Sequence, residues 1–312
     1  MEWRCAGLGW PDGRPVLRWE GGRRSELAYG TDIGFRAVGE RRCVGARGNP
    51  CPLRAVVPGR ATQARCPECA RLDRAFSVAA DGVPDDPRTY RVYLAWFGAG
   101  LVKVGITAEE RGAVRLLEQG AVAFCWLGRG PLMAARRTEE LLRAALGVPD
   151  RVPYARKREV RGALPAWPDR VGELTQLYGR AVALDGWAET LERVSFEAVD
   201  HSGAFGLRAF GSGMGRLRAD GTGAGGGDAA VVAGASFGVV REVVGGGAVA
   251  GRLVAAAGPD LHLETAGGDA LVVDTRVLVG WQLVAADAAA GVTVPVQAVE
   301  TGGGGAEQEG LF

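Results

Sequence analysis

Residues 90–146 constrain the fold of this 312-residue chain most strongly, because they alternate between strand-like and helix-like patterns. Two runs rich in β-branched and aromatic residues, Arg91–Phe97 and Leu101–Thr107, come first. Three small residues, Gly98-Ala99-Gly100, separate them, which is the pattern of a tight β-hairpin.

Two helices and a further strand follow the hairpin. Ala108–Gln119 has helical spacing of its apolar residues and ends at Gly120, a typical C-terminal stop. Ala121–Leu127 is a third apolar run and predicts a strand. Pro131 then begins a second helix, which ends at Gly147. The predicted order is strand, strand, helix, strand, helix.

This stretch resembles the core of the GIY-YIG endonuclease domain, over roughly a fifth of the chain. Tyr93 occupies the place of the first motif, and Lys103-Val104-Gly105 occupies the place of the second. Arg115 matches the arginine of the first helix, and Glu139 matches the metal-binding glutamate of the next. The sequences of residues 102–107 and 118–121 are also similar to those of an uncharacterised prokaryotic family, which joins a cysteine cluster to a GIY-YIG-like core.

The resemblance implies a metal-dependent phosphodiester nuclease. Such an enzyme must orient water and neutralise charge in the transition state. By the resemblance, the Tyr93 hydroxyl helps activate the water, Arg115 supports the phosphate, and Glu139 holds Mg²⁺ or Mn²⁺. Lys103 departs from the family, which usually has a second tyrosine there. Lysine binds phosphate as a point charge but is a poor base at its ordinary pKa, so phosphate contact survives this replacement better than water activation.

Each of these residues also has a purely structural interpretation. Tyr93 can be a strand residue with a hydrogen-bonded hydroxyl, and Arg115 can be a solvated helix residue. Arg111, one turn earlier, is then its rival for a functional role. Glu139 and Glu140 can be surface charges in ion pairs with arginines at helical spacing, namely Arg136, Arg137 or Arg143.

Four of the six cysteines are close in sequence and form the second strong signal, at Cys43, Cys51, Cys66 and Cys69. The last two form a CxxC knuckle, and four thiolates suit a closed, structural zinc site. A redox CxxC would leave the first pair unexplained, and the spacing fits an iron–sulfur cluster less well. Cys5 and Cys125 lie outside this group and are simplest as buried apolar residues.

The charge is unevenly distributed along the chain. Residues 40–165 carry 22 basic and 13 acidic side chains, whereas 166–312 carry 9 and 18. A basic region around the cysteines and the core predicts contact with the phosphate backbone of DNA or RNA. The basic stretch 151–161 is either a loop that contacts this backbone or a solvated connector. The acidic C-terminal part favours a protein partner.

The predicted fold is α+β, with a zinc-stapled N-terminal β region, a GIY-YIG-like ββαβα core and a small C-terminal antiparallel β domain. Short apolar runs broken by Gly, Pro and Asp indicate the last of these. The expected boundaries are 1–78 for the N-terminal region, 88–165 for the core, 166–195 for a helical cap, 196–300 for the acidic β domain and 301–312 for a disordered tail. Within the cap, helices are expected at 169–184 and 187–194.

Several classes of site and location are disfavoured. The glycine-rich segment 211–227 lacks the Gly-Lys-Ser/Thr ending of a phosphate-binding loop. The sequence shows no secretion signal in its first 15 residues and no apolar run long enough for a membrane span. Clustered cysteines in a chain of this length favour metal in a reducing compartment. We therefore expect a cytoplasmic protein without a membrane partner.

Three functional hypotheses follow from the sequence. The first is a divalent-metal-dependent nuclease acting on DNA or RNA through Tyr93, Lys103, Arg115 and Glu139. The second is a nucleic-acid-binding module on the same fold without catalysis, which Lys103 favours. The third is a scaffold whose zinc and β regions serve a protein complex.

Overall fold

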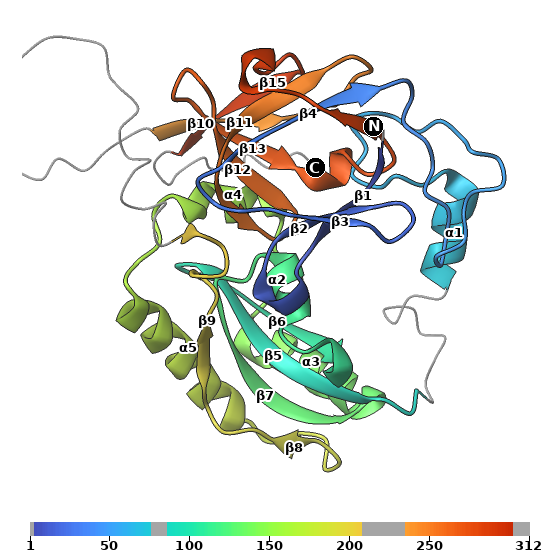
Figure 1. Cartoon of the computed structure of the whole chain (residues 1–312). Coiled ribbons are helices and arrows are strands. Elements are labelled where there is room, and N and C mark those ends of the chain that lie inside the picture. The colour runs from blue at the N-terminus through green and yellow to red at the C-terminus, as the bar shows by residue number, and fades with distance from the viewer. Residues whose placement is uncertain (1–2, 76–85, 208–234, 302–312) are drawn as a thin grey trace, which may run out of the picture.

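The computed structural model describes residues 3–75, 86–207 and 235–301. These residues form two lobes (Figure 1), one around a ten-stranded sheet and one around a smaller sheet with its helices. The glycine-rich segment 211–227, most of the linker 79–87 and the tail after residue 301 lie outside the described residues. None of the described helices is long and apolar enough to cross a membrane.

The large sheet is built from both ends of the chain. Its strands run in the order β15-β10-β13-β12-β11-β4-β14-β1-β2-β3. The N-terminal strands are β1 (Trp3–Gly9), β2 (Val16–Trp19), β3 (Arg24–Glu26) and β4 (Asp32–Val38). The C-terminal strands are β10 (Ala235–Val240), β11 (Ala248–Ala257), β12 (Asp260–Glu264), β13 (Ala270–Asp274), β14 (Gln282–Ala285) and β15 (Val296–Thr301).

This arrangement joins two regions that the sequence divides into separate domains. β4 pairs with β11 on one side and with β14 on the other, so the N-terminal strands complete a sheet made largely by the C-terminal ones. The sheet is also mixed rather than purely antiparallel, because β10 and β13 pair in parallel. Alternating apolar runs show that strands exist but do not specify their neighbours, which is why the sequence did not reveal the shared sheet.

The smaller sheet contains the stretch that the sequence singled out. Its strands are β5 (Thr89–Gly98), β6 (Leu101–Ala108), β7 (Ala123–Pro131), β8 (Glu192–Arg193) and β9 (Ala198–Asp200). The helices of this lobe are α2 (Val114–Gln119), α3 (Leu132–Leu146), α4 (Tyr154–Arg161) and α5 (Trp167–Val182). The order β6-β5-β7-β8 leaves β6 at the edge of the sheet.

Strand β5 is buried on both faces and carries the core of this lobe. Val92, Leu94 and Trp96 belong to the main hydrophobic core, together with residues of α3 and α5. Tyr93, which alternates with them, packs on the other face against Leu116 of α2. The period of two along the strand therefore directs alternate residues toward α3 and α5 on one face and toward α2 on the other.

Three expectations about individual elements were wrong. The first predicted helix divides into a 3-10 turn, η2 (Glu109–Arg111), and the short α2, because Gly112 adopts φ 46° and ψ −142° between them. The segment 187–194 contains β8 instead of a helix. The backbone N–H of Val194 donates to the Leu127 carbonyl (3.0 Å), which extends the sheet. The basic stretch 151–161 contains the helix α4 rather than only a loop.

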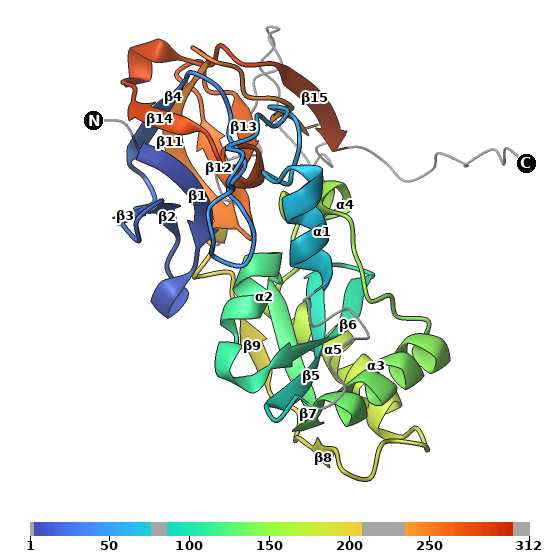
Figure 2. The same cartoon turned by 90° about the vertical axis from the view of Figure 1, so that its right-hand side faces the viewer.

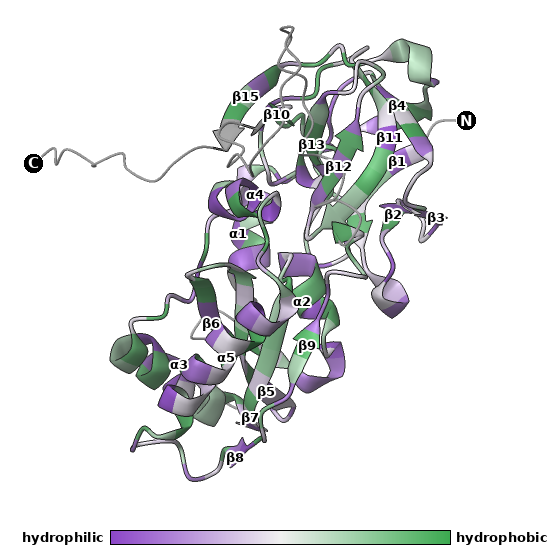
Figure 3. Ribbon diagram, turned by 90° about the vertical axis from the view of Figure 1, so that its left-hand side faces the viewer, coloured by the Kyte–Doolittle hydropathy of each residue, from purple (hydrophilic) through white to green (hydrophobic). Residues whose placement is uncertain are grey.

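The two lobes meet at α4 and at the turn between β11 and β12. Most residues of α4 are hydrophilic (Figure 3), and its arginines form ion pairs with the large sheet. Arg158 binds Asp260 and Asp274, and the buried Arg161 binds Asp260 at 2.6 Å. At the β11–β12 turn, Gly258 packs against the end of α2, where a Cβ on Gly258 would lie 3.0 Å from the Gly120 backbone nitrogen. Charged pairs and packing thus fix the smaller lobe on the large sheet.

Candidate functional site

A surface cleft of about 1200 Å³ lies along the edge strand β6. Tyr93 from β5, Lys103 from β6, Arg115 from α2 and Glu139 from α3 all line it. These are the four residues that the sequence proposed as catalytic, and four separate elements bring them together. Their shared position makes this cleft the candidate site.

Tyr93 is almost fully buried, with its hydroxyl at the base of the cleft. It lies opposite Gly105 in the β5–β6 ladder. A Cβ at Gly105 would lie only 2.4 Å from the Tyr93 hydroxyl oxygen, so only glycine leaves room for the ring. Burial raises the pKa of Tyr93, and the side-chain amide of Gln119 donates to its hydroxyl (2.9 Å). The phenol is therefore neutral and held in place.

Lys103 lies beside the tyrosine ring, with its ammonium 5.7 Å from the ring centroid. The ammonium donates to the Asp150 carbonyl (3.2 Å). Burial, followed by the positive charge of Arg115, lowers the pKa of Lys103 to about 8. A lysine with this pKa changes its protonation near neutral pH, so it is a better proton acceptor than an ordinary lysine.

The two glutamates of α3 differ in their surroundings. Glu139 is half-buried, and burial raises its pKa while the charge of Lys103 opposes this effect. Glu140 is exposed and pairs with Arg143 three residues later. Glu140 therefore fits the structural interpretation as a surface ion pair, whereas Glu139 is a half-buried carboxylate that lines the cleft.

The two candidate arginines share one partner. Arg111 binds Glu118 at 2.5 Å, and Arg115 lies 3.5 Å from the same carboxylate. Both side chains are about half exposed and line the cleft. The structure thus places both of them at the site rather than selecting one.

The lining of the cleft carries an excess of positive charge. Six of its side chains are basic and three are acidic, the acidic ones being Glu139, Glu140 and Asp150. The basic ones are Arg88, Lys103, Arg111, Arg115, Arg136 and Arg137. Such a concave surface attracts anions, and arginines suit phosphate geometry in particular.

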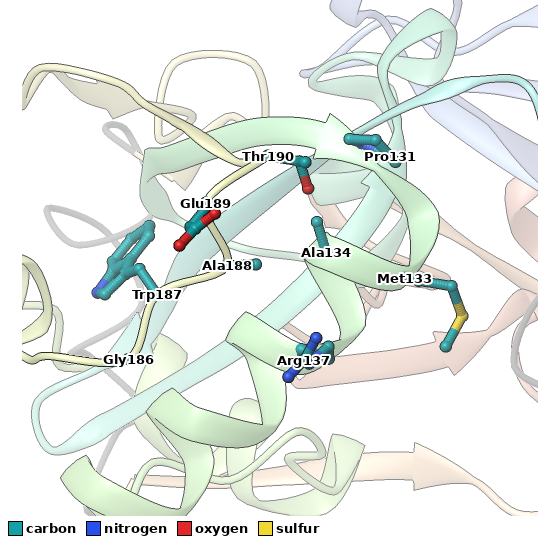
Figure 4. A pocket seen from close by; sticks show the side chains of 9 residues that line it. All are labelled: Pro131, Met133, Ala134, Arg137, Gly186, Trp187, Ala188, Glu189 and Thr190. Carbon is teal, nitrogen blue, oxygen red and sulfur yellow. The ribbon is translucent and has the colours of Figure 1, made fainter.

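A smaller pocket of about 470 Å³ adjoins the cleft. Figure 4 shows it between α3 and the segment 186–190. Met133, Arg137 and Gly186 line both the pocket and the cleft, so the two form a continuous depression. Met133 is 44 % exposed and offers an apolar contact beside the charged cleft.

Two residues that matter to this site were missed from the sequence. Gln119 lines the cleft and binds Tyr93, but in the sequence it stood out only as part of the family-like stretch 118–121 and was given no role. Lys157 of α4 is buried and donates to the Gln119 carbonyl (2.9 Å). In the sequence it belongs to the basic stretch 151–161 and is one of only two lysines beside 35 arginines, but neither signal links it to Gln119.

The cysteine cluster forms a second centre, next to α1 (Pro67–Ala75) on the side of the molecule that faces the viewer in Figure 2. The four sulfur atoms of Cys43, Cys51, Cys66 and Cys69 lie within 4.8 Å of one another, and all four residues are buried. Tetrahedral zinc with Zn–S distances of about 2.3 Å requires sulfurs about 3.8 Å apart, so the four thiols are close enough to hold one metal ion.

The backbone around the cysteines is arranged for thiolate ligands. The N–H groups of Gly45 and Cys66 donate to the Cys43 sulfur at 3.4 and 3.2 Å. Gly45 has φ +80°, and a Cβ there would lie 1.9 Å from the Asn49 carbonyl. The first loop thus forms a compact turn that the glycine makes feasible.

Arg41 anchors this segment to the large sheet. Its buried guanidinium donates to four backbone carbonyls, namely those of Pro58, Ala61, Arg276 and Val279. Two of these acceptors lie within the cysteine segment and two precede β14. The cysteine centre is therefore attached to both the N-terminal and the C-terminal parts of the large lobe.

Comparison with known proteins places the chain in a family. Residues 30–283, more than half of the chain, match the family described as "Protein of unknown function (DUF2797)", and the chain belongs to this family. The matched range extends from β4 through the cysteines and the cleft to β14. No curated protein and no solved structure matches the chain significantly. The expected membership in an uncharacterised family with a cysteine cluster is thus confirmed.

Proposed function

We propose that the cleft along β6 binds a phosphodiester of DNA or RNA and hydrolyses it with the help of a divalent cation. The observation that carries this proposal is the convergence of Tyr93, Lys103, Arg115 and Glu139 on one basic cleft. The same four residues correspond to the motif positions of the GIY-YIG endonuclease core that the sequence resembles. Geometry and motif positions therefore support the same reaction class.

The residues have distinct roles in this proposal. Arg111 and Arg115 contact the phosphate, because exposed guanidinium groups pair well with its oxygens. Tyr93, buried and neutral, orients the attacking water by hydrogen bonding. Lys103, whose pKa is lowered to about 8, contributes charge when protonated and accepts a proton when neutral.

The donor set fits a divalent cation. Mg²⁺ and Mn²⁺ bind through one or two carboxylates together with water and substrate phosphates. Glu139 supplies a half-buried carboxylate in the cleft and would hold the ion. Such an ion polarises a phosphoryl oxygen and stabilises the charge that develops on it.

The cysteine centre has a structural role in this proposal. Zn²⁺ bound by four thiolates has no open position for water or substrate, so it stabilises a fold rather than catalysing a reaction. The burial of all four cysteines and the N–H donors to Cys43 support such a closed site. Zinc would then hold the segment that links β4 to the smaller lobe.

A second candidate function is nucleic-acid binding without cleavage. Lys103 in place of the second motif tyrosine favours it, because an ammonium group close to Glu139 competes electrostatically with a divalent cation. The basic lining of the cleft supports both functions equally.

The test is incubation of the purified protein with single- and double-stranded DNA and RNA, in the presence of Mg²⁺, Mn²⁺ or EDTA. Glu139→Ala and Tyr93→Phe are the test variants. Glu140→Ala is the matched control, because Glu140 is the adjacent exposed residue paired with Arg143. We expect metal-dependent cleavage that both test variants lose and the control retains.

Other outcomes select among the alternatives. Salt-sensitive binding without cleavage of any substrate would support the binding module. If the protein neither binds nor cleaves nucleic acid, both proposals are overturned. The remaining hypothesis is then a scaffold with a protein partner, for which the acidic C-terminal part of the large sheet is the candidate surface.

A further inference from the structure

The C-terminal end of α2 is held by two side chains of α4. The Tyr154 hydroxyl donates to the Glu118 carbonyl (3.3 Å), and the Lys157 amino group donates to the Gln119 carbonyl (2.9 Å). The last carbonyls of any helix have no partner within it, and donors near a C-terminus stabilise them. Two consecutive carbonyls of α2 therefore depend on α4.

Lys157 is fixed by its surroundings. It is 3 % exposed, and its amino nitrogen lies 3.8 Å from the centroid of the Phe97 ring and 4.4 Å from that of the Tyr154 ring. Burial lowers the pKa of Lys157 to about 6, so its amino group is mostly neutral at pH 7 and still donates an N–H to the Gln119 carbonyl. The two rings enclose the side chain and direct it toward Gln119.

Helix α4 is in turn attached to the large sheet. Arg158 binds both Asp260 and Asp274 at 2.7 Å. The guanidinium of Arg276, which also binds Asp274, lies 4.2 Å from the centroid of the Tyr154 ring. The position of α4, and hence of Lys157, is set by the end of β13 and the start of β12.

Gln119 transmits this position to the cleft. Its backbone carbonyl accepts from Lys157, while its side-chain amide donates to the Tyr93 hydroxyl (2.9 Å). Because the hydroxyl oxygen accepts this bond, its own hydrogen can be donated to a molecule bound in the cleft. Helix α2 has only six residues, too few to hold its own end rigid without outside contacts.

We infer that Lys157 is a positioning residue, which fixes Gln119 so that the Gln119 amide orients the hydroxyl of Tyr93. The large sheet thereby sets the geometry of a site that lies entirely in the smaller lobe. The catalytic meaning of this inference rests on the proposed function, but the contact chain itself does not.

The experiment reads the Tyr93 environment directly. The five tyrosines are labelled with ¹³C in the ring, and the Tyr93 signal is assigned as the one missing in Tyr93→Phe. Lys157→Met keeps the apolar length of the side chain but removes its donor. Arg156→Met is the matched control on the same helix, where an exposed arginine pairs only with Glu159 among the described residues.

We expect Lys157→Met to shift the Tyr93 signal in the same direction as Gln119→Leu, and Arg156→Met to leave it unchanged. Tyr154→Phe, which removes only one hydroxyl, should give a smaller shift in that direction and serves if Lys157→Met does not fold. If Lys157→Met folds, an unchanged Tyr93 signal in that variant would overturn the inference. If only Tyr154→Phe folds, an unchanged Tyr93 signal in Tyr154→Phe would overturn it.

Activity gives a separate readout. If the wild type cleaves nucleic acid, Lys157→Met should lower kcat roughly 10- to 100-fold with little change in KM, because the site is misaligned but its binding charges remain. A higher KM with an unchanged kcat would contradict the positioning role. If the wild type cleaves nothing, the proposed reaction fails while the NMR result still decides the contact chain.

Discussion

At the scale of single residues, Gly105 shows most directly how the sequence shapes the cleft. A Cβ there would lie 2.4 Å from the Tyr93 hydroxyl oxygen and 2.5 Å from the ring carbon that bears it. We expect Gly105→Ala to displace the ring, break its bond to Gln119 and destabilise the protein by about 1–3 kcal/mol.

Urea denaturation measures this effect. Gly162→Ala is the control, since a Cβ at Gly162 meets nothing within 4 Å and its φ is negative. Equal stability of the two variants would show that the Tyr93 ring has room to move.

The charge of Lys103 should make nucleic-acid binding depend on pH. Burial and Arg115 lower its pKa to about 8, so the side chain loses its proton, and its attraction for phosphate, as the pH rises from 7 to 9. The slope of log Kd against log salt should then be smaller by about one at pH 9.

Lys103→Arg stays charged over this range and should show the same slope at both pH values. Fluorescence anisotropy with a labelled oligonucleotide at several salt concentrations gives both slopes. A slope that changes equally in the wild type and in Lys103→Arg would exclude Lys103 as the group responsible.

The extent to which the site could be predicted differs between its residues. Tyr93, Lys103, Arg115 and Glu139 lie within one local pattern of strands and helices, so their motif positions could be read from the sequence. Gln119 and Lys157 act through contacts that depend on how α2 packs against β5 and α4. No spacing rule connects residues in separate elements whose packing is not known.

At the scale of elements, the cysteine segment makes a clear prediction. Cys51→Ser should lower the metal content from one ion per chain to nearly none and destabilise the lobe by several kcal/mol, because metal binding contributes folding free energy. Elemental analysis of protein purified without chelator measures the content, and we expect zinc.

Cys125→Ala provides the comparison, because Cys125 is buried in β7 away from the cluster and should leave the metal in place. Full metal content in Cys51→Ser, or iron instead of zinc, would contradict the four-cysteine zinc site.

Element types were predictable where the local pattern agreed with the packing. The hairpin of β5 and β6, the strand β7 and the helix α3 lie where the sequence placed them. The segment 187–194 differed because Leu191 packs against Gly128 and Gly130 of β7, which leaves space for an added strand. That space exists only once the sheet has formed, so helical spacing alone was misleading.

At the scale of the whole molecule, the contact between the lobes should be sensitive to loss of one partner of its buried ion pairs, because the other charge would stay buried and uncompensated. Burial raises the pKa of Asp260, but the charges of Arg161 and Arg158 outweigh it and lower the pKa to about 2. Asp260→Asn leaves the buried Arg161 without a charged partner and should cost about 3–5 kcal/mol at pH 7.

The pH dependence has a definite sign. A carboxylate with a lowered pKa stabilises the folded state above its unfolded pKa of about 3.9, and this stabilisation is lost as the pH falls toward 2. Denaturation curves of the wild type and Asp260→Asn should therefore converge below pH 4. Asp269→Asn, exposed on the turn between β12 and β13, should match the wild type throughout.

The domain plan was the part of the fold least accessible to sequence reasoning. Each apolar run in 3–38 and 235–301 has a strand pattern, but pairing across more than 200 residues leaves no local trace. The sequence predicted a separate domain from residue 196, where short apolar runs broken by Gly, Pro and Asp begin, whereas the pairing of β4 joins that region to the N-terminal strands.

The position of β4 between β11 and β14 has a consequence for biosynthesis. Both of its neighbours are made some 200 residues later, so the edges of β4 stay unpaired while the ribosome produces the cysteine segment and the entire smaller lobe. The smaller lobe can fold as it emerges, but the large sheet can close only when translation is nearly complete. Nascent chains stalled before β11 should accordingly be a binding target for chaperones that recognise exposed strands.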